Sequence, residues 1–176
     1  MFEKDYLDAY NNKIKGNIPT ELGQNPLIRL SLHSNQLTGN IPSELGRLTI
    51  LNDLQLQNNK LGGTIPDEIF NALKLQRIEL QFNDLEGTIP SSVSKLQNLN
   101  TLLLNDNDLD GTIPSEVALG NKTSVDFQGN YFSEVSCQTI QSLKVAFCDN
   151  FCDRSFSFPC PCCDSCEDDG TICSSR

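Results

Sequence analysis

The sequence predicts an α/β solenoid, a right-handed superhelix of six repeats whose short parallel strands line a concave face. The first observation is a tetrapeptide, Gly-x-Ile-Pro, that occurs five times at steps of 23, 24, 24 and 24 residues. Its copies begin at Gly16, Gly39, Gly63, Gly87 and Gly111. The second is a run of alternating leucines ahead of each copy, and the third is an asparagine that recurs between the two. A fixed period of this length indicates stacked supersecondary units.

The repeat unit reads LxxLxLxxNxLxGxIPxxLG over residues 27–46. The same frame fits residues 51–70, 75–93 and 99–117, while a first copy is degenerate at its start and a sixth is decayed at its end. The LxL part predicts a short strand, in which successive side chains point to opposite faces. We therefore expect the leucines to face the core and the residues between them to face outward.

A second group of repeated residues predicts how the chain leaves each strand. The asparagines fall where the chain turns, and a buried amide there needs hydrogen-bond partners, which neighbouring backbone groups can supply as a ladder through the stack. The glycines permit a turn that side chains would obstruct, and proline suits the convex turn because it donates no hydrogen bond. The asparagines of this ladder are Asn12, Asn35, Asn59, Asn83, Asn107 and Asn130.

With these residues the chain resembles the leucine-rich-repeat family, and its LxGxIP half resembles the plant-type subclass. The resemblance covers about residues 4–135. It divides the chain into a solenoid at 1–135 and a cysteine-rich cap and tail at 136–176. It also implies the neighbourhood of receptor ectodomains and of proteins that inhibit cell-wall-degrading enzymes.

The net charge and the residues at which the chain begins indicate what the protein contacts. The 13 basic and 23 acidic side chains leave a net charge of −10, which argues against nucleic acid and anionic membrane surfaces. No apolar run reaches the roughly 18 residues that a membrane-spanning helix needs. The chain begins inside a repeat without a cap, so Leu7 and Ile14 face an open end. We expect a fragment, or an N-terminal edge that contacts another chain or a missing upstream segment.

The cysteines all lie in the last forty residues. An even number in a short segment predicts a disulfide framework in an extracellular or cell-surface protein. A zinc site of four thiolates is the alternative, because Cys163 and Cys166 form a CxxC motif. Cys137 with Cys148 or Cys152 is a plausible pair. The eight candidates are Cys137, Cys148, Cys152, Cys160, Cys162, Cys163, Cys166 and Cys173.

Other motifs predict neither catalysis nor a cofactor. The run from Asp106 to Gly111 resembles the start of a calcium loop, but the position for the bidentate acid is Val117, and the glycine belongs to the repeat. His33 is the single histidine and lies on the second strand, far along the stack from every cysteine. Asn121 begins an acceptor sequon for N-glycosylation, and a glycan there would indicate secretion.

The frame also gives the outward residues of the concave face. Phe82 and Leu103 are apolar where their columns are otherwise polar, and they lie on adjacent repeats. Such a pair, flanked by polar side chains, suits a protein or peptide ligand, whereas the amide-rich column could instead bind sugar hydroxyls of a glycan. The candidate binding residues are Tyr6, Tyr10, Arg29, His33, Gln57, Arg77, Gln81, Phe82, Leu103 and Asn105.

Three functional hypotheses follow from the sequence. The first is a non-catalytic recognition module that binds a protein or peptide on the concave face. The second is a structural subunit or wall component that docks through its N-terminal edge. The third is a scaffold with a metal-binding cysteine tail.

Overall fold

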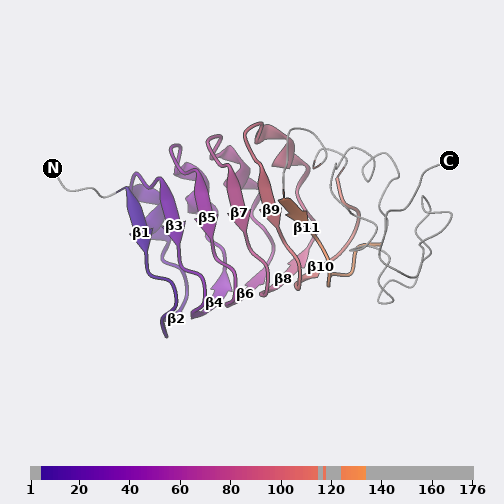
Figure 1. Cartoon of the computed structure of the whole chain (residues 1–176), viewed down its shortest axis with the longest axis horizontal. Coiled ribbons are helices and arrows are strands. Elements are labelled where there is room, and N and C mark those ends of the chain that lie inside the picture. The colour runs from indigo at the N-terminus through magenta and orange to yellow at the C-terminus, as the bar shows by residue number, and fades with distance from the viewer. Residues whose placement is uncertain (1–4, 115–116, 118–123, 134–176) are drawn as a thin grey trace.

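The computed structural model describes residues 5–114, 117 and 124–133, and these residues form a solenoid. Figure 1 shows one strand of each repeat standing beside the next, with short helical segments on the opposite side of the stack. The six strands are parallel and follow chain order. They are β1 (Tyr6–Asp8), β3 (Arg29–Ser31), β5 (Asp53–Gln55), β7 (Arg77–Glu79), β9 (Thr101–Leu103) and β11 (Ser124–Asp126).

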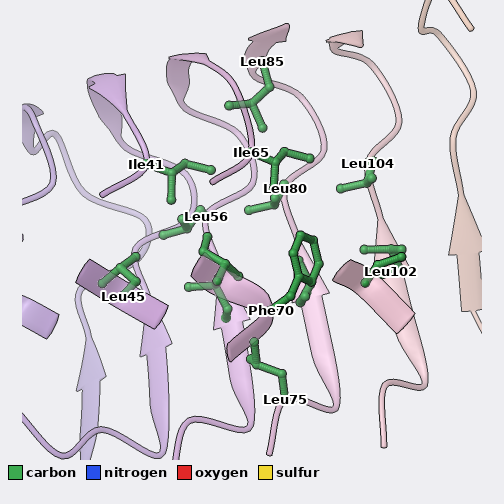
Figure 2. Close-up of a cluster of buried hydrophobic side chains, with 14 of the residues drawn as sticks. Ile41, Leu45, Leu56, Ile65, Phe70, Leu75, Leu80, Leu85, Leu102 and Leu104 are labelled. Atoms are coloured by element: carbon green, nitrogen blue, oxygen red, sulfur yellow. The ribbon is translucent and has the colours of Figure 1, made fainter. Parts of the chain in front are cut away.

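The leucine columns form the core, as the alternating pattern predicts. The central residue of every strand after β1 is buried, and Leu30, Leu54 and Leu102 are examples. Figure 2 shows Phe70 in the same buried cluster as the leucines that flank the strands. Because every repeat contributes to one continuous cluster, the core grows along the stack instead of closing within one repeat.

The asparagine ladder is also confirmed. Asn83 is buried, and its Nδ2 donates to the carbonyl oxygens of Leu56 (3.1 Å) and Leu80 (3.0 Å). Its Oδ1 accepts a hydrogen bond from the backbone N–H of Leu61 at 3.0 Å. Asn59 makes the equivalent bonds one repeat earlier. From Asn35 onward, each amide therefore joins the backbone of its own repeat to that of the repeat before it.

A second parallel sheet follows the ladder, and the sequence did not indicate it. It lies below the first row of strands in Figure 1 and is formed by the xLxGx part of each repeat. Glycines with positive φ end or interrupt these strands, among them Gly39 (φ 73°) and Gly87 (φ 75°). The strands are β2 (Lys15–Gly16), β4 (Gln36–Asn40), β6 (Lys60–Gly63), β8 (Asp84–Gly87) and β10 (Asp108–Leu109).

The helical segments are single 3-10 turns that follow the prolines. Each is five residues long, which is little more than one turn. They are η1 (Thr20–Gln24), η2 (Ser43–Arg47), η3 (Asp67–Asn71) and η4 (Ser91–Lys95).

Glycine allows the first three of these segments, η1 to η3, to stack closely on one another. A Cβ on Gly23 would lie 2.2 Å from the carbonyl oxygen of Glu44, and one on Gly46 would lie 2.0 Å from that of Glu68. In the next repeat this position is Phe70, whose ring enters the core. The packing between successive turns therefore changes at η3.

The predicted cysteine-rich cap at 136–176, its eight cysteines and the sequon at Asn121 lie outside the described residues. No helix in the described part of the chain is long and apolar enough to cross a membrane.

Candidate functional site

The strand register brings the predicted outward residues into columns across the concave face. Glu79 lies beside Gln55 on one side and beside Leu103 on the other. Arg77 is likewise paired with Asp53 and Thr101. The spacing of adjacent strands is about 4.8 Å, so each column is a continuous row of side chains.

An aromatic and charged group occupies the N-terminal end of this face. The Arg29 guanidinium donates to both carboxylate oxygens of Asp8, with the Nε–Oδ1 distance at 2.9 Å, and this bonding raises the pKa of Arg29. The Cζ atom of Arg29 lies 5.3 Å from the centroid of the Tyr6 ring. The rings of Tyr10 and His33 stack, with centroids 4.7 Å apart and planes 8° from parallel. Here the polar groups satisfy one another.

The centre of the face is rich in hydrogen-bond acceptors. Arg77 Nε lies 3.9 Å from Asp53 Oδ1 and 3.8 Å from Glu79 Oε1, which is close enough for attraction but too long for a hydrogen bond. Gln57 Nε2 donates to Glu79 Oε2 at 2.8 Å. Burial raises the pKa of the Glu79 carboxyl above its ordinary value of 4.5, and the charge of Arg77 partly offsets that effect.

Two glutamines at this centre differ from the expected outward arrangement. Gln57 is only 9 % exposed, because its amide folds against Glu79 of the next repeat. Within the described residues, the Oε1 atoms of Gln57 and Gln81 are buried without a hydrogen-bond partner. The repeat frame gives a residue's column but not the conformation of a long side chain, so the sequence could not show these two acceptors.

The apolar pair lies next to this centre. Phe82 is 49 % exposed, and its backbone N–H donates to Asn105 O in the next repeat at 3.0 Å. Leu103 is half-buried beside Glu79. Asn105 Nδ2 donates to Asp106 Oδ2 at 2.7 Å. The structure therefore places Gln81 and Phe82 on one repeat and Leu103 and Asn105 on the next. Tyr6, Tyr10, Arg29 and His33 form a separate group.

Phe82 also has an unusual backbone conformation. Its φ is +57°, in the left-handed region, which bulky L-residues rarely adopt. The residues at the same position of the other repeats also have positive φ, and they are Asn11, Ser34, Asn58, Asp106 and Gly129. Four of those five are asparagine, aspartate or glycine, the types that tolerate this region best. That preference is the signal from which the turn could have been predicted.

Among the residues described, no group of three or more histidine, cysteine, aspartate or glutamate side chains is arranged to hold a metal ion. The calcium-loop resemblance at Asp106 also has a structural explanation, since Asp106 occupies the left-handed turn and Asp108 begins β10.

Comparison with known proteins places this geometry in a family. A sequence profile described as Leucine Rich Repeat matches residues 26–48, 51–72 and 74–96. Comparison with curated protein sequences gave no match. The solved BIR3–SERK2 complex from Arabidopsis thaliana contains a chain that is 40 % identical, with a TM-score of 0.64 over 73 % of this chain and 69 % of that one.

Two larger receptors are also similar. The HAESA ectodomain of Arabidopsis, solved with an N-terminally extended IDA peptide hormone, is 33 % identical, with a TM-score of 0.77 over 80 % of this chain and 24 % of that one. The plant peptide hormone receptor RGFR1, solved with RGF2, is 36 % identical, with a TM-score of 0.74 over 76 % of this chain and 22 % of that one. The chain thus spans less than a quarter of the length of these two receptor chains.

The sequence of this chain is 40 % identical to that of a solved chain of which it covers 69 %. The strand register and the asparagine ladder agree with this similarity. The chain therefore belongs to the leucine-rich-repeat family.

Proposed function

We propose that this chain is a plant-type leucine-rich-repeat recognition module, secreted or on the cell surface, that binds an extended peptide or a protein segment on its concave face and catalyses no reaction. The observation that carries this proposal is the apolar pair of Phe82 and Leu103. Both lie on a face whose other central residues are polar or charged.

The backbone of Phe82 strengthens this interpretation. A left-handed conformation costs an L-residue roughly 1–2 kcal/mol, and the other repeats reduce that cost with small or polar residues. Phe82 bears the cost and also leaves half of its ring in water. Such strain is typical of residues kept for binding. An aromatic anchor with an aliphatic neighbour is also a common core of peptide-binding surfaces.

The similar structures agree with a peptide or protein ligand. HAESA and RGFR1 were each solved with a peptide hormone, and BIR3 was solved with SERK2. Their ligands belong to those proteins, and what carries over to this chain is the use of the fold as a binding surface.

A selection experiment tests the proposal. A phage-displayed library of random dodecapeptides is selected on the full chain and then depleted on the Phe82→Asn/Leu103→Thr variant. The matched control is Ile50→Thr/Leu73→Ser, because Ile50 (43 % exposed) and Leu73 (55 % exposed) are also exposed apolar residues on successive repeats, away from the strand columns. We expect peptides that bind the parent and the control but not the concave-face variant. Peptides that bind all three proteins equally would contradict the proposal.

Docking through the N-terminal edge stays a prediction. Ile14 is exposed, while Leu7 packs partly against the core. A change of both residues to serine that abolishes association with a partner chain, with the concave face intact, would favour this second function.

A further inference from the structure

The centre of the concave face has an excess of acceptors and of negative charge. The outward residues of the concave strands and of the turns that follow them include five carboxylates, of Asp8, Asp53, Glu79, Asp106 and Asp126, and two guanidinium groups, of Arg29 and Arg77. Asp8 is saturated by Arg29 through two hydrogen bonds. Arg77 lies between Asp53 and Glu79 but reaches neither within hydrogen-bond distance, and the side-chain donors to these two carboxylates are the neutral amides of Gln55 and Gln57. One negative charge therefore stays unbalanced at the centre.

Neutral acceptors lie beside that charge. Gln57 and Gln81 are neighbours on adjacent strands, since the parallel ladder continues from Leu56 N→Glu79 O to Asn58 N→Gln81 O. A buried acceptor without a partner costs about 1–3 kcal/mol, so a donor supplied to either oxygen is strongly favoured. The terminal torsion of glutamine is broad, so a ligand donor can draw either oxygen toward the face.

These groups match the chemistry of a basic side chain. An arginine or lysine carries several donors and no acceptor, whereas an acidic or purely apolar side chain would leave the oxygens unsatisfied. The raised pKa of Glu79 supports this match, because a nearby cation stabilises the carboxylate that burial disfavours.

The apolar pair fixes how far this basic group lies from the next ligand side chain. Leu103 is directly beside Glu79 on the neighbouring strand, and Phe82 follows Gln81 in the chain. The two subsites are thus one to two strand spacings apart, roughly 5–10 Å. In an extended peptide, residues i and i+2 lie about 7 Å apart and point to the same side.

On the basis of the proposed function, we infer that the ligand is an extended peptide with an arginine or lysine two residues from an apolar side chain. Glu79, Gln57 and Gln81 bind the basic group, and Phe82 and Leu103 bind the apolar one. The acidic centre and its apolar neighbour thus form one two-part recognition site.

A charge exchange on the selected peptides tests this inference. Peptides from the dodecapeptide library are sequenced, and one binder is resynthesised with its basic residue changed to glutamate. We expect the library to enrich a basic residue two positions from a large apolar one. The glutamate peptide should bind the parent chain at least tenfold more weakly, and Glu79→Lys should restore part of its affinity. Glu86→Lys is the matched control, because Glu86 carries the same charge on exposed β8, away from the concave face.

The outcomes separate the inference from the function on which it rests. Glu79→Gln should weaken binding of the basic peptide and leave binding of a neutral analogue unchanged. This variant keeps the size of the side chain, so it serves as the test if Glu79→Lys fails to fold. Peptides that need Phe82 and Leu103 but show no basic residue and no response at Glu79 overturn the inference alone. Selected peptides that ignore Phe82 and Leu103 overturn the proposed function as well.

Discussion

Phe82 departs from the side-chain pattern of the repeat, while its backbone conformation matches that of the other repeats. The turn that follows each concave strand has a positive φ in every repeat, whatever the side chain. The geometry of the turn is therefore set by the ladder around it. Phe82 accepts that geometry at an energetic cost, and its ring is exposed where a ligand can reach it.

Replacement of this phenylalanine should stabilise the protein. We expect Phe82→Asn to raise the free energy of unfolding by about 1 kcal/mol, because asparagine tolerates the left-handed region better. Thermal denaturation should show a melting temperature higher by roughly 2–4 °C. The reverse change one repeat earlier, Asn58→Phe, should lower stability by a similar amount. A destabilised Phe82→Asn variant would show that the ring supports the fold.

The asparagine ladder gives a second residue-level prediction. We expect Asn83→Ala to lower the free energy of unfolding by about 2 kcal/mol, because it leaves the buried N–H of Leu61 without this partner and removes one of the two asparagine donors from each of two buried carbonyls. Asn12 is the control, since it is exposed and its side chain, among the described residues, bonds only Ala9 O and Tyr10 O of its own repeat. Urea denaturation should place Asn12→Ala within about 1 kcal/mol of the parent. Equal losses for the two variants would contradict a ladder that depends on burial.

At this scale the sequence predicts columns better than conformations. The period assigns Glu79 and Leu103 to neighbouring positions of one column, and the register confirms it. It cannot show that Gln57 turns against Glu79, because that contact depends on a flexible side chain and on the residue one repeat later. The acceptor-rich centre therefore appeared only in the structure.

The elements differ in how plainly the sequence indicates them. Strands such as β5 carry alternating leucines, so the core-facing residues follow directly from the pattern. The second sheet lacks such a signal, because even its longer strands β4, β6 and β8 each contain only one buried leucine and a glycine with positive φ. Its hydrogen bonds form between repeats, and no pattern within one repeat reveals them.

The close stacking of the 3-10 turns is tested at Gly46. A methyl group there would lie 2.0 Å from the backbone oxygen of Glu68, which cannot move without η3. We expect Gly46→Ala to lower the free energy of unfolding by about 2 kcal/mol or more. Gly62→Ala is the control, because its new Cβ would meet Asp84 O at an ordinary 3.6 Å. Calorimetric melting should show little change for Gly62→Ala, and equal effects at both sites would contradict this packing.

At the scale of the whole molecule, the solenoid turns a one-dimensional repeat into a graded surface. The N-terminal end carries aromatic rings and the hydrogen-bonded Arg29–Asp8 pair, and the centre carries acceptors with the apolar pair beside them. Since the buried leucine columns recur along the stack, these differences arise from the outward positions. Under the proposed function, recognition is encoded in residues that the fold leaves free to vary.

Titration calorimetry of one selected peptide against the full chain tests concave-face binding most directly. We expect Phe82→Asn/Leu103→Thr to raise the dissociation constant about thirtyfold, a loss of about 2 kcal/mol in binding free energy, while Ile50→Thr/Leu73→Ser leaves it unchanged. Because Phe82→Asn should not destabilise the fold, such a loss reports binding. An unchanged dissociation constant in the first variant, or an equal loss in the second, would contradict a binding site on the concave face.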